Sequence, residues 1–230
     1  MSDLKERYFK VRDVFKSYTE HVGNPEAELI AISKTRTVEE IQALYDLGHR
    51  HFGENKVQEL DQKVPALPND IVWHFIGHIQ SNKAKPVLQH VNYIHAVDSI
   101  KLLDRLQRIQ QELATQVQFL LQFNVTNEDQ KYGFRLSELE DLESKLSERP
   151  LDALRGCMCM TAVGMDAAEQ QSTFQKLVEA QHRLQLLSPQ INELSMGMSG
   201  DWQQAVGAGA RWIRIGTAIF GPRNYGGATT

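Results

Sequence analysis

Short apolar runs recur along the chain, and each is followed by a stretch whose apolar residues have helical spacing. The first run covers 29–33. In the stretch after it, Thr37 and Glu40 form a capping-box pattern and Gly48 ends the predicted helix. The same pairing occurs eight times. The predicted strands are 29–33, 51–53, 71–76, 93–97, 117–123, 154–160, 193–196 and 212–215, and the predicted helical segments are 38–47, 55–63, 81–90, 99–114, 136–146, 167–187, 201–208 and 217–220.

Eight strands alternating with eight helical segments predict an α/β fold, a closed (β/α)8 TIM barrel. The alternative is an open doubly wound sheet. Such a sheet normally carries a Gly-rich loop after its first strand, where this sequence has Ser33-Lys34-Thr35-Arg36. An amphipathic helix over 2–22 precedes the first strand. Because no linker or sequence repeat divides the chain, we expect residues 1–230 to form a single domain.

Composition narrows the function classes. The 230 residues carry a formal net charge of −4, with 41% hydrophobic and 23% charged residues, which is typical of a globular domain. No apolar run is long enough for a membrane span or a signal peptide, and no basic stripe favours nucleic acid. The only two cysteines, Cys157 and Cys159, are badly spaced for a disulfide. We therefore expect a reducing, cytoplasmic compartment, with neither membrane nor nucleic acid as a partner.

Lys34 is the most informative polar residue. It lies just beyond the first strand and shares a face with Ile30 and Ile32, because side chains alternate along a strand. Active sites of such barrels lie at the carboxyl ends of the strands. A partly desolvated lysine there has a lowered pKa and can attack a carbonyl. The alternative is a lysine that extends into solvent past the strand end.

Glycine-rich turns follow the seventh and eighth predicted strands, where barrels often bind phosphate. Ser199 and Gly200 precede one helical segment, and Gly216 and Thr217 open the other. Such turns expose backbone N–H groups to an anion, although they can also be ordinary helix starts. Together with Lys34, they indicate a phosphorylated aldehyde held as a Schiff base, for which pyridoxal phosphate is the obvious candidate.

Arg214 lies two residues before Gly216, so both are expected on the inward face. A guanidinium keeps its proton, so it would donate to an unprotonated pyridine nitrogen and make the ring a weak electron sink. An arginine paired with an outer carboxylate is the alternative. His74 and His78 do not share a helical face, so no metal site is expected. Cys157 and Cys159 are predicted to be buried thiols.

Five sequence blocks closely resemble the pyridoxal phosphate homeostasis protein family. They are distributed from the first strand to Gly221, so the match extends over nearly the whole chain. They are Ser33-Lys34-Thr35; residues 51–59, HFGENKVQE; residues 73–83, WHFIGHIQSNK; residues 195–199, SMGMS; and residues 214–221, RIGTAIFG.

The resemblance implies a single-domain barrel of the alanine racemase N-terminal type, with pyridoxal phosphate linked to Lys34. By motif, Arg214 would face the pyridine nitrogen. Ser199, Gly216 and Thr217 would hold the phosphate, and Asn55 and His74 would border the ring. The family is regarded as handling pyridoxal phosphate, with no established reaction. The resemblance therefore implies residues that bind the cofactor and no catalytic residue.

Two functions follow from these residues. The first is a carrier that holds pyridoxal phosphate reversibly, with apo-enzymes that use this cofactor as possible recipients. The second is an amino-acid racemase, which needs a second base opposite Lys34. Alanine racemases take that base from a separate domain, and the nine residues after Gly221 are too few to form one. The carrier is therefore favoured, and a monomer is expected because no coiled-coil seam is visible.

Overall fold

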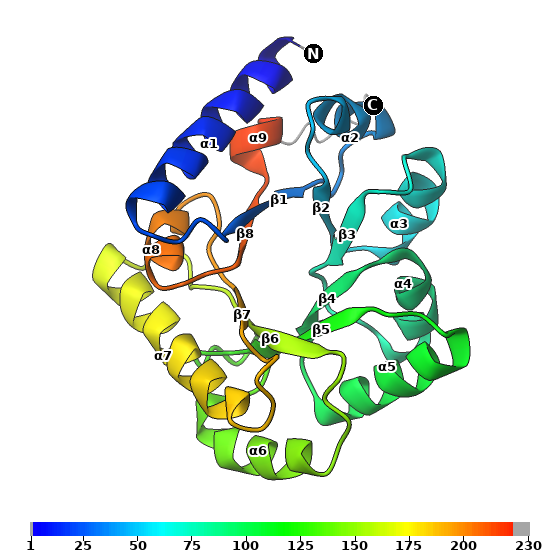
Figure 1. Ribbon diagram of the computed structural model, residues 1–230, viewed down its shortest axis with the longest axis vertical. Coiled ribbons are helices and arrows are strands. Elements are labelled where there is room, and N and C mark those ends of the chain that lie inside the picture. The colour runs from blue at the N-terminus through cyan, green and yellow to red at the C-terminus, as the bar shows by residue number, and fades with distance from the viewer. Residues whose placement is uncertain (1, 223–230) are drawn as a thin grey trace, which may run out of the picture.

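The computed structural model describes residues 2–222 and contains a closed barrel of eight parallel strands (Figure 1). Each strand pairs with its neighbour in sequence, and β1 closes the ring by pairing with β8, with Ile30 opposite Arg214. The predicted fold is confirmed. The strands are β1 (Glu28–Ile32), β2 (His51–Glu54), β3 (Val72–Phe75), β4 (Tyr93–Val97), β5 (Gln118–Phe123), β6 (Leu154–Cys159), β7 (Glu193–Ser195) and β8 (Trp212–Ile215).

Helices surround the strands (Figure 1). All nine α-helices within residues 2–222 were predicted. The segments expected at 81–90 and 136–146 each begin with a 3₁₀ turn, and the 3₁₀ turn over 64–66 was not predicted. The helices are α1 (Ser2–His21), α2 (Val38–Asp46), α3 (Val57–Lys63), α4 (Ala84–His90), α5 (Ile100–Leu113), α6 (Leu139–Ser147), α7 (Ala167–Gln185), α8 (Trp202–Gly207) and α9 (Thr217–Phe220), with 3₁₀ turns η1 (Val64–Ala66), η2 (Ser81–Lys83) and η3 (Leu136–Glu138). None of the helices within residues 2–222 combines the length and apolarity of a membrane span.

Apolar side chains fill two layers, as the strand period of two requires. The larger layer lies between the strands and the helices and includes Phe52, Phe119 and Leu103. The smaller layer lies in the barrel interior, which it shares with the buried polar residues His74, His95 and Arg214, and it consists of Ile30, Ile32, Ala96, Leu120, Met158 and Trp212. The interior is therefore a packed core, and a ligand has room only at the ends of the barrel.

The extra N-terminal helix α1 packs beside α9 (Figure 1). Arg7 on α1 donates from Nε to the carbonyl oxygen of Ile219 (3.1 Å) and from Nη2 to that of Phe220 (3.2 Å). Arg36 donates to the carbonyl oxygen of Gly221 (2.6 Å). These bonds satisfy carbonyls at the end of α9 that no helical N–H can reach. The arginines thereby fix the short helix that follows β8.

Candidate functional site

A cavity of about 450 Å³ opens at the carboxyl ends of the strands, and we call it the mouth cavity. It brings together six of the seven sequence-predicted site residues. Its volume lies in the range of small-molecule sites. Its lining residues are Ile32, Lys34, Asn55, Ile76, Gly77, Met158, Met160, Met198, Ser199, Gly200, Arg214, Gly216 and Thr217.

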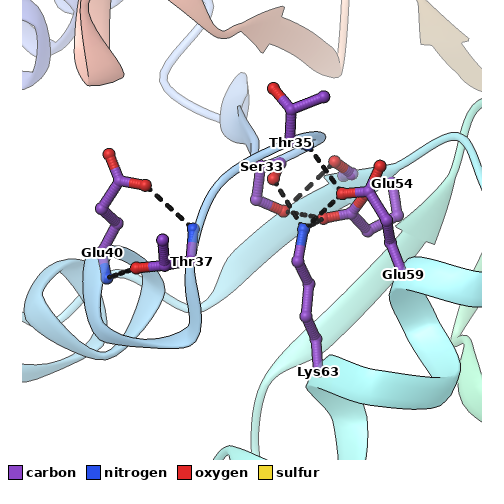
Figure 2. Close-up of polar contacts among 8 residues, drawn as sticks. Ser33, Thr35, Thr37, Glu40, Glu54, Glu59 and Lys63 are labelled. Atoms are coloured by element: carbon purple, nitrogen blue, oxygen red, sulfur yellow. Dashed lines mark hydrogen bonds and ion pairs between the residues drawn. The ribbon is translucent and has the colours of Figure 1, made fainter. Parts of the chain in front are cut away.

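Lys34 is half-buried and lines the mouth cavity in the turn between β1 and α2. Two local features shape this turn. Thr35 has a φ of 63°, a left-handed conformation that is costly for a β-branched residue. Thr37 then begins α2, where its Oγ1 accepts from the N–H of Glu40 and the Glu40 carboxylate accepts from the N–H of Thr37 (Figure 2).

A buried ion cluster on β2 and α3 holds the other side of this turn (Figure 2). Lys63 Nζ donates to Ser33 O (2.9 Å), Glu54 Oε1 (2.6 Å) and Glu59 Oε2 (2.6 Å). Glu59 Oε2 also accepts from the N–H of Thr35 (2.6 Å), and Glu54 Oε1 accepts from Ser33 Oγ (2.7 Å). The cluster thus bonds the residues on both sides of Lys34.

Electrostatics in this cluster differ between its two acids. Burial raises the pKa of Glu54, although Lys63 opposes that shift. Burial also acts to raise the pKa of Glu59, but hydrogen bonds from Lys63 and the Thr35 backbone outweigh it and lower the pKa. Sequence reasoning missed this cluster. The one available signal was the spacing of Glu59 and Lys63, four residues apart on a predicted helix.

Arg214 reaches the mouth cavity from the barrel interior and is only 4% exposed. Its Nη1 donates to Ser195 Oγ (2.6 Å) and its Nη2 to the carbonyl oxygen of Cys159 (2.9 Å). Burial lowers the pKa of its guanidinium. Among the ion pairs of residues 2–222, none involves Arg214. The alternative of an outer carboxylate partner is therefore wrong.

Ser199, Gly216 and Thr217 line the side of the mouth cavity that β7 and β8 supply. The backbone N–H groups of these three residues and of Gly200 donate to no protein acceptor in the described part of the chain. A Cβ added to Gly216 would lie 3.4 Å from Ile32 Cβ, which shows how closely this turn approaches β1. Several backbone N–H groups without a protein acceptor, on residues that line one cavity, suit an anionic ligand.

Asn55 follows β2 and lines the mouth cavity. Its Oδ1 is buried without a hydrogen-bond partner. Gly77 packs tightly on its backbone, because a Cβ there would overlap the carbonyl oxygen of Asn55. A buried polar atom without a partner is costly, so it suits a polar ligand group.

His74 differs from the other predicted site residues. It does not line the mouth cavity. It is fully buried in the barrel interior, where its two ring nitrogens lie 3.0 Å from His51 Nδ1 and 2.9 Å from His95 Nε2. The reason is depth: His74 lies in the middle of β3, whereas Lys34 and Asn55 lie beyond the ends of their strands.

Comparison with known proteins places this geometry in a family. Residues 10–224 match the alanine racemase N-terminal domain family. The chain is 42% identical over 203 residues to the pyridoxal phosphate homeostasis protein of Vibrio alginolyticus, covering 86% of this chain and 87% of the relative. It is 35% identical over 231 residues to that of Escherichia coli strain K12, covering 98% and 99%.

Solved structures agree. PipY of Synechococcus elongatus, solved with pyridoxal phosphate bound, is 38% identical with a TM-score of 0.83, over 95% of this chain and all of the other. Alanine racemase of Bartonella henselae is 19% identical with a TM-score of 0.67, over 94% of this chain and 59% of the other, a likeness of fold alone.

The fold and the matched residues define a barrel of the alanine racemase N-terminal type. Within that class, the chain belongs to the pyridoxal phosphate homeostasis protein family.

Proposed function

We propose that this chain binds pyridoxal phosphate in the mouth cavity and holds it reversibly through a Schiff base on Lys34. The observation that carries the proposal is the convergence on one cavity of a lysine amine, a buried guanidinium and several unbonded backbone N–H groups. The Lys34 amine would condense with the aldehyde, forming a C=N bond and releasing one water. The reverse reaction would release the cofactor.

The remaining lining residues fit the rest of this cofactor. The N–H groups of Ser199, Gly216 and Thr217 would hold the phosphate. Arg214 would donate to the pyridine nitrogen, and the unpartnered amide oxygen of Asn55 would accept from a polar group beside the ring. His74 is not in this set, because it does not line the cavity. Relatives named for pyridoxal phosphate homeostasis, and PipY solved with this cofactor, support the assignment.

Pyridoxal phosphate supplies an electron-withdrawing ring to any group attached at its aldehyde carbon. Arg214 holds its proton tightly and would donate a hydrogen bond without protonating the ring. This arrangement favours holding the cofactor over carbanion chemistry. A carrier or homeostasis role is therefore the function that the site supports best.

The second candidate is an amino-acid racemase, and the cavity lining argues against it. Racemisation of this kind uses two proton-transfer groups, one on each side of the substrate. Within residues 2–222, Lys34 and Arg214 are the only ionisable side chains that line the mouth cavity. Arginine keeps its proton, so the described lining of the cavity offers no second base to act with Lys34.

We further propose that the protein works as a monomer in the cytoplasm and passes the cofactor to apo-enzymes. The large hydrophobic side chains exposed in the described chain are scattered, which is normal for a monomer's surface. They are Val14, Val22, Tyr132, Val163 and Leu186. Cys157 and Cys159 are free thiols, as a reducing compartment maintains them. Light scattering measures the mass, and reactivation of a purified apo-enzyme measures transfer.

The test of binding is a titration of the purified protein with pyridoxal phosphate, followed by borohydride reduction and peptide mass spectrometry. We expect a long-wavelength Schiff-base absorbance band and a reduced adduct on Lys34. Lys34→Ala should lose both, whereas Lys176→Ala, a change at an exposed site on α7, should keep both. Absence of the band, or an adduct only on other lysines, would refute the proposal.

Carrier and racemase are separated by incubating the loaded protein with single amino-acid enantiomers in deuterated water. A carrier exchanges the α-proton far more slowly than an enzyme does. Exchange on the order of 1 per second or faster would establish the racemase instead.

A further inference from the structure

Three histidines and a serine form a continuous hydrogen-bonded line through the barrel interior, and we call it the histidine column. His51 Nδ1 lies 3.0 Å from His74 Nε2, and His74 Nδ1 lies 2.9 Å from His95 Nε2. His95 Nδ1 lies 2.7 Å from Ser195 Oγ, which accepts from Arg214 Nη1 at 2.6 Å. The column thus connects β2, β3, β4 and β7 to the arginine of the mouth cavity.

The imidazoles of the column are neutral. Burial lowers the pKa of His51 to about 4 and lowers those of His74 and His95 well below the usual value. The positive charges of Arg211 and Arg214 add to the shifts of His51 and His95, respectively. A neutral imidazole carries one N–H and one lone pair. The column can therefore have two orders: every N–H points toward Ser195, or every N–H points away from it.

The arginine selects between these orders. Arg214 Nη1 always donates to Ser195 Oγ, so the serine hydrogen is available for His95 Nδ1. This arrangement fits the order in which every imidazole N–H points away from Ser195. If every N–H pointed toward Ser195 instead, His95 would also donate to Ser195 Oγ, and the serine hydrogen would need another acceptor. Within residues 2–222, His95 and Arg214 are the only hydrogen-bond partners of Ser195 Oγ. N–H groups that point toward Ser195 would also turn the positive end of each imidazole dipole toward the buried cation Arg214.

Packing leaves the rings little freedom to change this order. Trp212 lies against all three imidazoles, with centroid distances of 5.4 Å to His51, 4.9 Å to His74 and 6.4 Å to His95. Tyr93 stacks on His74 at 4.8 Å and 12°. Both His74 and His95 are fully buried. The column is a fixed part of the core.

A buried guanidinium without a carboxylate partner needs compensation from dipoles. The charge of Asp201 acts on Arg214 only from beyond ion-pair distance, and Asp201 bonds instead to Thr161 Oγ1 (2.6 Å) and the N–H of Met198 (2.6 Å). The lone-pair ends of the imidazoles supply the compensation. Because the column is uncharged overall, Arg214 keeps a whole positive charge toward the mouth cavity.

We propose that the histidine column positions Arg214 and compensates its buried charge through imidazoles that all carry their proton on Nε2. His95 and Ser195 are then positioning residues that act on a ligand through Arg214. The effect on the cofactor rests on the proposed function, but the proton positions do not.

The first test reads proton positions in the wild-type protein without cofactor, by long-range ¹H–¹⁵N correlation spectra of the imidazoles. We expect His51, His74 and His95 all to be neutral Nε2–H forms. An Nδ1–H form at His74 or His95 would overturn the proposal. Because no ligand is needed, this result stands even if the chain does not bind pyridoxal phosphate.

The second test compares His95→Phe with His95→Asn after loading with pyridoxal phosphate labelled with ¹⁵N in its ring. The amide oxygen of asparagine can replace Nδ1 as the acceptor for Ser195, whereas phenylalanine cannot. We expect His95→Phe to weaken the binding of pyridoxal phosphate about ten- to a hundredfold. This is the range for losing one hydrogen bond in a network that ends on a charged group. We also expect His95→Phe to shift the ring ¹⁵N signal. His95→Asn should restore most of the affinity and most of the wild-type position of the ¹⁵N signal.

A purely structural role of His95 would lower stability in both variants without moving the ring ¹⁵N signal, and that result would overturn the proposal. Ser195→Ala is the second variant if His95→Phe does not fold. It removes one oxygen and should shift the ring signal in the same direction. An unchanged signal in a folded Ser195→Ala protein would equally overturn the proposal.

Discussion

Lys63 Nζ and Glu54 Oε1 lie 2.6 Å apart in a buried ion pair beside the turn that carries Lys34 (Figure 2). The side chain of Glu54 is fully buried and that of Lys63 is 6% exposed. The pair therefore has little solvent to compensate for the loss of either partner. The same ammonium group also bonds Ser33 and Glu59, so the pair connects the core to the turn.

Replacement of Lys63 by methionine should destabilise the protein strongly. The change keeps much of the side-chain volume but leaves two carboxylates without their cation. We expect a loss of about 3–5 kcal/mol in the free energy of unfolding, measured by urea denaturation. Lys176→Met, at an exposed site on α7, is the matched control and should cost less than about 0.5 kcal/mol. Equal losses in the two variants would contradict this account of the cluster.

Gly156→Ala should disrupt the pairing of β6 with β7. A Cβ at this position would overlap the carbonyl oxygen of Glu193, and that oxygen belongs to the backbone of the neighbouring strand. We expect a cost of about 3 kcal/mol or more in the free energy of unfolding. Gly207→Ala at the end of α8, where a Cβ would meet nothing within 4 Å, should be neutral or slightly stabilising. A Gly156→Ala protein as stable as the wild type would show that the strands can separate without cost.

Acid should destabilise the protein in a defined pH range. Histidines of the unfolded chain take up protons near pH 6.5, whereas burial lowers the pKa of His49 and of His51 to about 4 in the folded protein. Between these values the unfolded chain binds more protons. The free energy of unfolding therefore falls as the pH drops from 6.5 toward 4, by up to ~1.4 kcal/mol per pH unit for each histidine.

Urea denaturation at several pH values between these limits measures that slope. His49→Asn should reduce the slope by about one proton, because it removes one buried imidazole. Gln175→Ala, at an exposed site on α7, removes no titratable group and should leave the slope unchanged. A wild-type slope of zero between pH 6.5 and pH 4 would show that the buried histidines are already protonated in the folded protein.

The two thiols should be inert in the folded protein. Cys157 and Cys159 are both 0% exposed, and burial raises the pKa of Cys159 to about 12 and that of Cys157 further. The thiolate is the reactive form, so a chromogenic disulfide reagent should label neither residue in native buffer. Both should react in denaturant. Rapid labelling of the native protein would mean that β6 opens readily.

The fold was predictable because each strand and helix carries its own local signal. The apolar run before Ser33 and the capping pattern of Thr37 and Glu40 identify β1 and α2 without any long-range contact. The same kind of signal occurs eight times, and eight strand–helix units favour a closed barrel over an open sheet. The ends of elements were less predictable, as at Ser81 and Leu136, because an α-helix and a 3₁₀ turn differ little in sequence.

The candidate site was predictable where position along a strand decides which residues meet. Lys34, Asn55 and Gly216 follow strand ends, so they gather at one end of the barrel. The depth of His74 was not predictable, because the period of two assigns a face but not a layer. Nor was the contact of Lys63 with Ser33, 30 residues away, which depends on how α3 packs against β2.

The pairing of β1 with β8 makes the mouth cavity a product of ring closure. Lys34 and Arg214 are 180 positions apart in sequence, and they meet only because the first strand lies against the last. A ligand that contacts both therefore binds only chains whose ring is complete. Ligand at a hundred times its dissociation constant would stabilise such chains by about 2.7 kcal/mol. Bound cofactor would then stabilise the closed ring as a whole, and scarcity of the cofactor would remove that stabilisation.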